Sequence, residues 1–127
     1  MTQYSSTYAM KYDAATGTWT SSNQGKSSSY SGLVITADSV DIEITFDWVV
    51  SSESNWDAVY VYANGQQLVN KSSGSGEKSG TITITLRAGN TLQVYYGKDG
   101  SGDKGSDTAT ISNLTVAGSP VTDADIA

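Results

Sequence analysis

The chain has 127 residues, a net charge of −6 at pH 7, and neither cysteine nor histidine. This composition excludes disulfide bonds, thiolate or imidazole metal ligands, and nucleophiles that histidine activates. The acidic balance also disfavours nucleic acids and anionic membranes as partners, because a phosphate-binding surface needs clustered lysine and arginine.

The length fits one domain, which we expect over residues 1–118, followed by a C-terminal tail over 119–127. The start of the chain lacks the basic and apolar regions of a secretory signal. No stretch reaches the roughly 18 apolar residues that a membrane span needs. We therefore expect no membrane insertion. Two origins stay open: a phage structural protein that travels by another route, or a piece excised from a longer chain.

Apolar and polar residues alternate with a period of two along most of the chain, which predicts strands. In chain order, the expected strands are 8–13, 17–21, 33–36, 41–48, 58–62, 67–71, 81–86, 91–96 and 108–116. The clearest is 41–48, whose inward face carries Ile42, Ile44, Phe46 and Trp48. In the last strand the alternation changes phase near Asn113, which predicts a β-bulge at that point.

Turn-forming residues separate the expected strands. Asn64-Gly65 predicts a two-residue hairpin, because both central positions of a type I′ turn need a positive φ. Ala88-Gly89-Asn90 predicts a hairpin between its neighbouring strands in the same way. Many short strands with frequent turns indicate two packed antiparallel sheets, with an up-and-down barrel as the lesser alternative.

Aromatic residues form one candidate site. The chain has 8 Tyr and 3 Trp beside 1 Phe, and both Tyr and Trp can stack on sugar rings while hydrogen bonding to hydroxyls. Tyr60 and Tyr62 share one face of their strand, and Tyr95 lies on the polar side of another. If the three are exposed together, they form a ligand-binding platform. The alternative is that they cover a sheet or pack against the glycine-rich loops. Trp48 is expected in the core, and Trp56 at one end of the sandwich.

Three segments carry a resemblance to a known family. They are 17–19 followed by 29–32, then 44–57 running on to 65, and 92–101 followed by 105–109. The middle segment reads Phe46-Asp47-Trp48-Val49-Val50-Ser51-Ser52-Glu53-Ser54-Asn55-Trp56-Asp57. Over roughly 17–116 the chain resembles MAM-like and CUB-like jelly-roll modules of secreted bacterial proteins and phage adhesins. The resemblance implies an all-β, two-sheet antiparallel β-sandwich of jelly-roll type and an accessory role in binding or spacing.

Acidic residues form a second candidate site. The resemblance implies that the loops bearing Glu53, Asp57, Asp99 and Asp107 lie at one end of the sandwich. Carboxylates that meet there would suit Ca²⁺, a hard cation that prefers oxygen ligands. The alternative is structural, because aspartates often cap their own turns through backbone N–H groups. Both interpretations stay open at this point.

The function expected from these features is binding without catalysis. Glu53 and Asp57 could in principle act as acid and base in glycoside hydrolysis, but such pairs also arise by chance in an acidic chain, and a domain this small has little room for a deep cleft. We expect a surface module on a virion or extracellular protein that recognises a glycan or a host-surface receptor.

The alternative function is a structural virion component, such as a capsid decoration, fibre or tail protein, that binds other viral proteins. The alternating Thr81, Thr83 and Thr85 could dock onto further copies of the chain, which makes self-association an open question. These threonines could equally be ordinary solvated strand residues.

Overall fold

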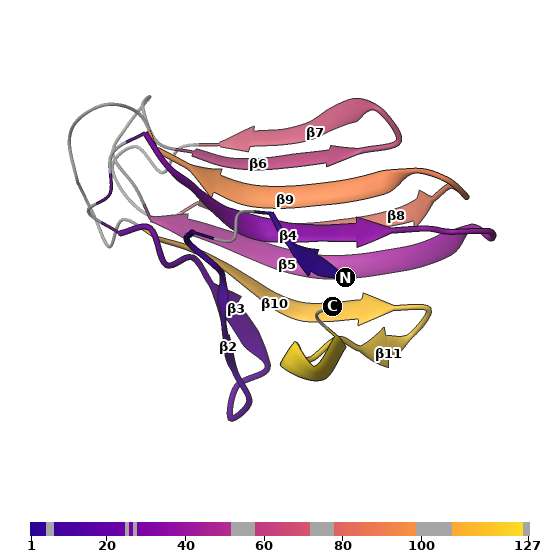
Figure 1. Ribbon diagram of the computed structural model, residues 1–127, viewed down its shortest axis with the longest axis horizontal. Coiled ribbons are helices and arrows are strands. Elements are labelled where there is room, and N and C mark those ends of the chain that lie inside the picture. Colours follow the sequence, from indigo (N-terminus) through magenta and orange to yellow (C-terminus); the bar gives the residue numbers. More distant parts are fainter. Residues whose placement is uncertain are drawn as a thin grey trace.

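The structure is a computed structural model that describes residues 1–4, 7–24, 26, 28–51, 58–71, 78–98 and 108–125. Two antiparallel sheets pack face to face in it, which confirms the predicted all-β sandwich (Figure 1). The described part of the chain holds no α-helix, and one short 3-10 helix, η1, covers Asp123–Asp125. Within these residues no helix is long and apolar enough to cross a membrane.

The first sheet has the strand order β1-β4-β9-β6-β7. Its strands are β1 (Thr2–Gln3), β4 (Tyr30–Thr36), β9 (Thr91–Gly97), β6 (Ala58–Ala63) and β7 (Gln66–Lys71). The second sheet has the order β2-β3-β10-β5-β8. Its strands are β2 (Lys11–Asp13), β3 (Thr18–Thr20), β10 (Thr108–Val116), β5 (Ile42–Ser51) and β8 (Lys78–Leu86), and β11 (Ser119–Pro120) pairs with β10.

The eight strands from β3 to β10 follow a jelly-roll order. Four of them form the run β3-β10-β5-β8 and the other four form the run β4-β9-β6-β7. Successive strands alternate between the two sheets, except at the β6–β7 hairpin. This arrangement matches the double-sheet jelly roll in which long connections cross between layers.

The β6–β7 hairpin turns at Asn64 and Gly65, whose φ values are 52° and 77°. Both angles are positive, so the predicted type I′ geometry is confirmed. The hairpin predicted at Ala88-Gly89-Asn90 is wrong, because β8 pairs with β5 in one sheet and β9 pairs with β4 and β6 in the other. Turn residues reverse the chain without fixing its pairing partner. Here the chain crosses from one sheet to the other at the turn, so the apolar faces of β8 and β9 cover the same core from opposite sides.

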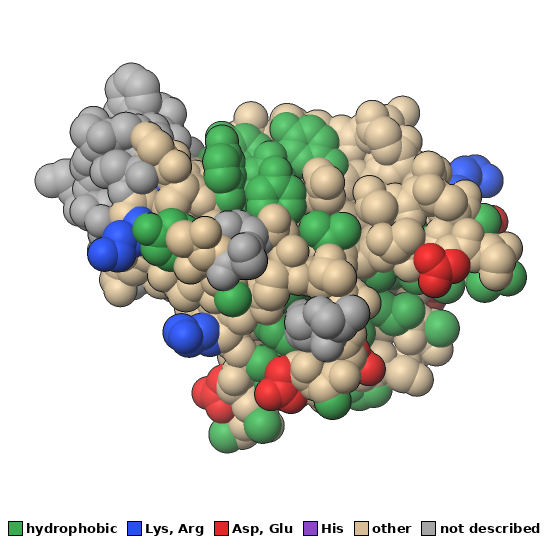
Figure 2. Space-filling view, in the orientation of Figure 1, with side chains coloured by type: hydrophobic (Ala, Val, Ile, Leu, Met, Phe, Trp, Pro, Cys, Tyr) green, Lys and Arg blue, Asp and Glu red, His purple; other side chains and the backbone are tan. Residues whose placement is uncertain are grey.

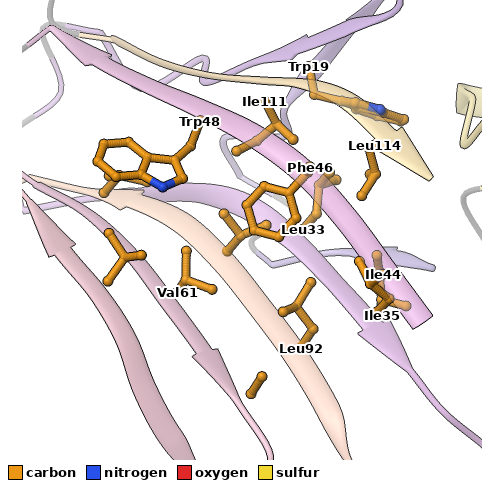
Figure 3. Close-up of a cluster of buried hydrophobic side chains, with 14 of the residues drawn as sticks. Trp19, Leu33, Ile35, Ile44, Phe46, Trp48, Val61, Leu92, Ile111 and Leu114 are labelled. Atoms are coloured by element: carbon orange, nitrogen blue, oxygen red, sulfur yellow. The ribbon is translucent and has the colours of Figure 1, made fainter. Parts of the chain in front are cut away.

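The core fills the space between the sheets. Figure 3 shows Phe46 of β5 pointing toward Leu33 of β4, with Ile111 of β10 beside them. All three side chains are fully buried, and Trp48 is 5% exposed, which confirms its predicted place in the core. Burying a large apolar side chain contributes about 1.5–3 kcal/mol, so this layer is the main source of stability in a chain without disulfides.

The end of β10 departs from regular pairing. Asn113 has a φ of 53°, and the register between β10 and β5 shifts between Ser112 and Thr115. This irregularity confirms the bulge predicted there. Beyond it, β11 pairs back onto β10 and Val121 is 8% exposed, so the chain stays packed on the sandwich within the segment expected to be a tail.

Candidate functional site

Five tyrosines gather on the outer face of the first sheet, and we call them the tyrosine patch. They are Tyr4, Tyr30, Tyr60, Tyr62 and Tyr95. Residues of β9 and β6 alternate between the two faces of the sheet, so Tyr95 and Tyr60 point outward while Tyr96 and Val61 are buried. In Figure 2, hydrophobic-class side chains, which include tyrosine, gather over the middle of the front sheet.

The register of the sheet aligns several patch residues in one row. Tyr95 of β9 pairs with Gly32 of β4 on one side and with Tyr60 of β6 on the other. Tyr60 in turn pairs with Asn70 of β7. At the other end of the row, the backbone N–H of Tyr4 donates to the carbonyl of Gly32 over 2.7 Å. Residues that are distant in sequence therefore meet because strand pairing places them at one level.

The lack of a side chain on Gly32 allows the closest contact between two rings of the patch, those of Tyr4 and Tyr95. A Cβ atom at this position would lie 2.3 Å from the Cβ of Tyr95 and 2.2 Å from the carbonyl oxygen of Val94. With no side chain there, the rings of Tyr4 and Tyr95 stack over β4 with their centroids 4.2 Å apart and their planes at 14°. Such offset stacking of aromatic rings adds about 0.5–1.5 kcal/mol beyond the buried area.

Tyr95 lies at the centre of the tyrosine patch. Its ring stacks on Tyr60 at 5.2 Å and on Tyr62 at 6.1 Å, and meets the edge of Tyr30 at 5.5 Å. Because β9 lies between β4 and β6, Tyr4 and Tyr60 cover opposite faces of the Tyr95 ring. Burial raises the pKa of Tyr95 above that of an ordinary tyrosine, and the hydroxyls of Tyr4 and Tyr62 add to this effect. The central phenol is therefore neutral at physiological pH.

The rings of Tyr30 and Tyr60 both lie over Gly97, which is buried. Tyr30 pairs with Gly97 in the ladder between β4 and β9. A Cβ atom on Gly97 would lie 3.0 Å from Cε2 of Tyr60 and 3.2 Å from Cε1 of Tyr30. The two rings thus lean over bare backbone. Tyr30 is 48% exposed, so a ligand can reach its ring directly.

Among the described residues, polar but uncharged groups lie next to the tyrosine patch. Tyr62 donates a hydrogen bond from its hydroxyl to Oε1 of Gln67 over 2.7 Å, and Gln93 pairs with Tyr62 across the β6–β9 ladder. In Figure 2, Lys, Arg, Asp and Glu side chains lie toward the margins of this face, away from the central group. Within the described part of the chain, the patch therefore offers aromatic carbon, hydroxyls and amides, with charged side chains toward the margins of the face.

Two hollows lie elsewhere on the sandwich. One, of about 330 Å³, is lined by Ile35, Ile42 and Val116, and the other, of about 200 Å³, by Tyr12, Leu114 and Val121 among others. No residue lining either hollow belongs to the tyrosine patch. The tyrosine patch lies on the outer face of the sheet, which suits an extended ligand.

The structure brings together the three tyrosines that the sequence singles out, Tyr60, Tyr62 and Tyr95. Sequence reasoning missed Tyr4 and Tyr30. Tyr30 begins β4, three residues before the predicted start of that strand, and Tyr4 follows the two-residue strand β1. Tyr30 could have been found by extending the predicted strand 33–36 toward the N-terminus. Tyr30 lies two residues before Gly32, so both residues fall on one face of the extended strand.

The predicted calcium ligands Glu53, Asp57, Asp99 and Asp107 all lie outside the described residues, as does Trp56. Within the described ranges, no group of three or more acidic side chains is placed to hold a metal ion. The calcium site stays a prediction.

The outer face of the second sheet carries the predicted row of Thr81, Thr83 and Thr85, all exposed. Thr81 donates to Oδ1 of Asp47 over 2.6 Å, and Nδ2 of Asn113 donates to Oδ2 of the same carboxylate over 2.7 Å. These two hydrogen bonds hold the pKa of Asp47 below its usual value. The hydroxyl of Thr81 thus has a local structural partner, and that of Thr83 accepts a long hydrogen bond of 3.4 Å from Thr45.

Comparison with known proteins gives a likeness in fold. No protein-family model matches the sequence, and no curated protein matches it either. Among solved structures, the chain is similar to the secreted serine protease VesC from Vibrio cholerae, with a TM-score of 0.57 and 12% sequence identity. The similarity covers 87% of this chain and 23% of the protease chain. At this identity the likeness concerns the fold alone, so the resemblance to MAM-like and CUB-like modules stays a prediction.

Proposed function

We propose that the chain is a non-catalytic binding module that recognises a glycan through the tyrosine patch, on the surface of a virion or of an extracellular protein. The observation that carries this proposal is the convergence of five tyrosines on one open sheet face. A solvent-facing cluster of large aromatic side chains is costly to leave bare and is typical of a recognition surface.

The chemistry of the patch favours a neutral glycan. Tyrosine combines a ring that packs on the C–H face of a sugar with a hydroxyl that hydrogen bonds to its polar rim. Gln67 and Gln93 add amide groups at the same face. The net charge of −6 disfavours sulfated or otherwise anionic sugars, because like charges repel.

The rings of the patch divide into two roles. Tyr30 is the most exposed of them and offers a ring for stacking. Tyr95 has both faces covered by other tyrosines, so it fixes their positions and offers only its edge and hydroxyl. A prearranged set of rings loses little side-chain freedom when a ligand binds.

Affinity electrophoresis in gels containing soluble neutral polysaccharides (a β-glucan, a galactomannan, a xylan and a dextran) tests the proposal. We expect at least one of them to retard the protein, and Tyr30→Ala or Tyr60→Ala to weaken that binding about tenfold or more. The matched control is Tyr12→Ala, because Tyr12 packs on Trp19 in the other sheet. Equal effects of the patch and control variants would contradict the assignment of the patch.

The alternative function, a structural virion component, gives a different result in the same assay. It requires no glycan binding, and the patch would then bind another virion protein. A folded chain that no polysaccharide retards, neutral or acidic, would overturn glycan recognition and favour this alternative.

A further inference from the structure

Strand β8 forms one edge of the second sheet. All nine of its residues pair with β5 in a continuous register, from Ile42 opposite Leu86 to Val50 opposite Lys78. Among the residues that the structure describes, no strand pairs with its other side. In Figure 1 this strand lies behind β9, in the rear sheet.

The side chain of Asn64 reveals which backbone groups face outward from β8. Its Nδ2 donates to the carbonyl of Thr85 over 3.0 Å, and the N–H of Arg87 donates to its Oδ1 over 3.0 Å. Backbone groups two residues apart in a strand point the same way. Those of Thr83 and Thr81 therefore point away from β5 as well, and Asn64 occupies only the C-terminal end of this edge.

The remaining edge lacks the usual protection against strand pairing. Natural edges carry charged residues, prolines or bulges that prevent the addition of another strand. From Ser79 to Thr85, β8 has no charged residue and no proline, and its pairing with β5 has no bulge. Ile82 and Ile84 pack against the core but stay partly exposed. A partner strand would cover this apolar surface.

We propose that a second copy of this chain pairs with β8 in antiparallel orientation, with the twofold axis at Ile82. The strand reads Gly80-Thr81-Ile82-Thr83-Ile84, so this register places Thr81 opposite Thr83 of the other copy. Each copy then offers the outward N–H and C=O of both threonines to the other. An isologous contact of this kind needs a self-complementary surface, which this alternation of threonine and isoleucine supplies.

The apolar side of the contact fits the same register. Ile82 meets Ile82 of the second copy at a non-hydrogen-bonded pair, where the Cα atoms of two antiparallel strands lie roughly 4.5 Å apart. Ile84 falls opposite Gly80, where the indole of Trp48 already covers the backbone, so the Ile84 side chain would meet that ring. No charged side chain of one copy faces a like charge of the other between Ser79 and Thr85.

Sedimentation velocity over a wide range of protein concentration tests the pairing. We expect a concentration-dependent dimer, which Thr83→Pro abolishes because it removes an outward N–H group without touching the ladder to β5. Thr83→Lys is a second variant, which places a charge at the same edge and keeps the backbone intact. The matched control is Leu68→Lys on β7, at the edge of the other sheet, where Leu68 is 40% exposed.

Disulfide trapping fixes the register. The native chain has no cysteine, so Ile82→Cys introduces a single thiol at the proposed axis, where the Cα spacing suits a disulfide. We expect Ile82→Cys to form a covalent dimer under mild oxidation, and Leu68→Cys to form little. A monomer at all concentrations, or a dimer that survives both Thr83 substitutions, would overturn the proposal.

Discussion

Tyr4 and Tyr95 stack with their ring centroids 4.2 Å apart, although β4 lies between Tyr4, which follows β1, and strand β9, which carries Tyr95. The contact spans two strand spacings, which the rings cover because Gly32 between them has no side chain. Tyr95 then contacts Tyr60 on its other face. One glycine thus allows a stack of rings that runs from Tyr4, beside β4, through Tyr95 on β9 to Tyr60 on β6.

Gly32→Ala should destabilise the fold. The added methyl group would overlap the backbone carbonyl of Val94 as well as Tyr95, and backbone atoms within a ladder cannot easily move aside. We expect the free energy of unfolding to fall by about 2–3 kcal/mol, as for other overpacked sites. Urea denaturation measures this change, with Thr36→Ala, at an exposed position of the same strand, as the control. A loss below that of Thr36→Ala would show that the strand adjusts freely.

Gly97→Ala should affect binding more than stability. Its methyl group would meet the rings of Tyr60 and Tyr30, which are the ends of side chains that can rotate. We expect the free energy of unfolding to fall by less than about 1 kcal/mol. The displaced rings should lower glycan affinity several-fold in affinity electrophoresis. Unchanged affinity would place the ligand away from the rings of Tyr30 and Tyr60.

Stability should decline at alkaline pH because of Tyr95. Burial raises the pKa of this phenol in the folded chain, so the unfolded chain loses the proton first as pH rises past about 10. The contribution is therefore complete below pH 10 and is lost as pH rises toward the folded-state pKa. Denaturation at pH 9, 10 and 11 should show a steeper decline for the native chain than for Tyr95→Phe. Ultraviolet titration should show that the last phenol to ionise disappears in this variant. Parallel declines in both proteins would contradict this assignment.

Calcium should stabilise the chain if Glu53, Asp57, Asp99 and Asp107 converge as predicted. A ligand that binds only the folded state adds about 2.7 kcal/mol at a hundredfold excess over Kd, which raises Tm by several degrees for a domain of this size. Thermal unfolding in EGTA and then in millimolar Ca²⁺ measures the shift, and Asp57→Ala or Asp99→Ala should abolish it. An unchanged Tm would assign these acids to turn capping.

Strand alternation made most of the fold predictable. The period of two in 41–48 matches β5, in which Ile44, Phe46 and Trp48 are buried, and the phase change near Asn113 matches the bulge of β10. The pairing of strands was not predictable in the same way. The turn at Gly89 reads as a hairpin, yet the choice between pairing and crossing depends on which distant strands cover β8 and β9.

The sequence predicted only those residues of the candidate site whose orientation follows from alternation within a single strand. Tyr60 and Tyr62 share a face by their spacing, and Tyr95 follows from the alternation of β9. Tyr4 lies after a strand of two residues that has no periodic signal, and its place depends on a backbone hydrogen bond to Gly32. Register across a sheet is a tertiary property, so sequence spacing alone could not place these residues in one row.

The row from Tyr4 to Asn70 has a kinetic consequence. Apart from the local β6–β7 hairpin, it depends on pairings of β9 with β4 and with β6 that are distant in sequence, and contacts of that kind form slowly in folding. No single hairpin of the chain contains the stacked rings of Tyr4, Tyr95 and Tyr60. A fragment that holds only the β6–β7 hairpin would therefore carry Tyr60 and Tyr62 without the stack that Tyr95 completes. The near-ultraviolet circular dichroism of the coupled tyrosines should accordingly appear in the last phase of refolding, together with binding itself.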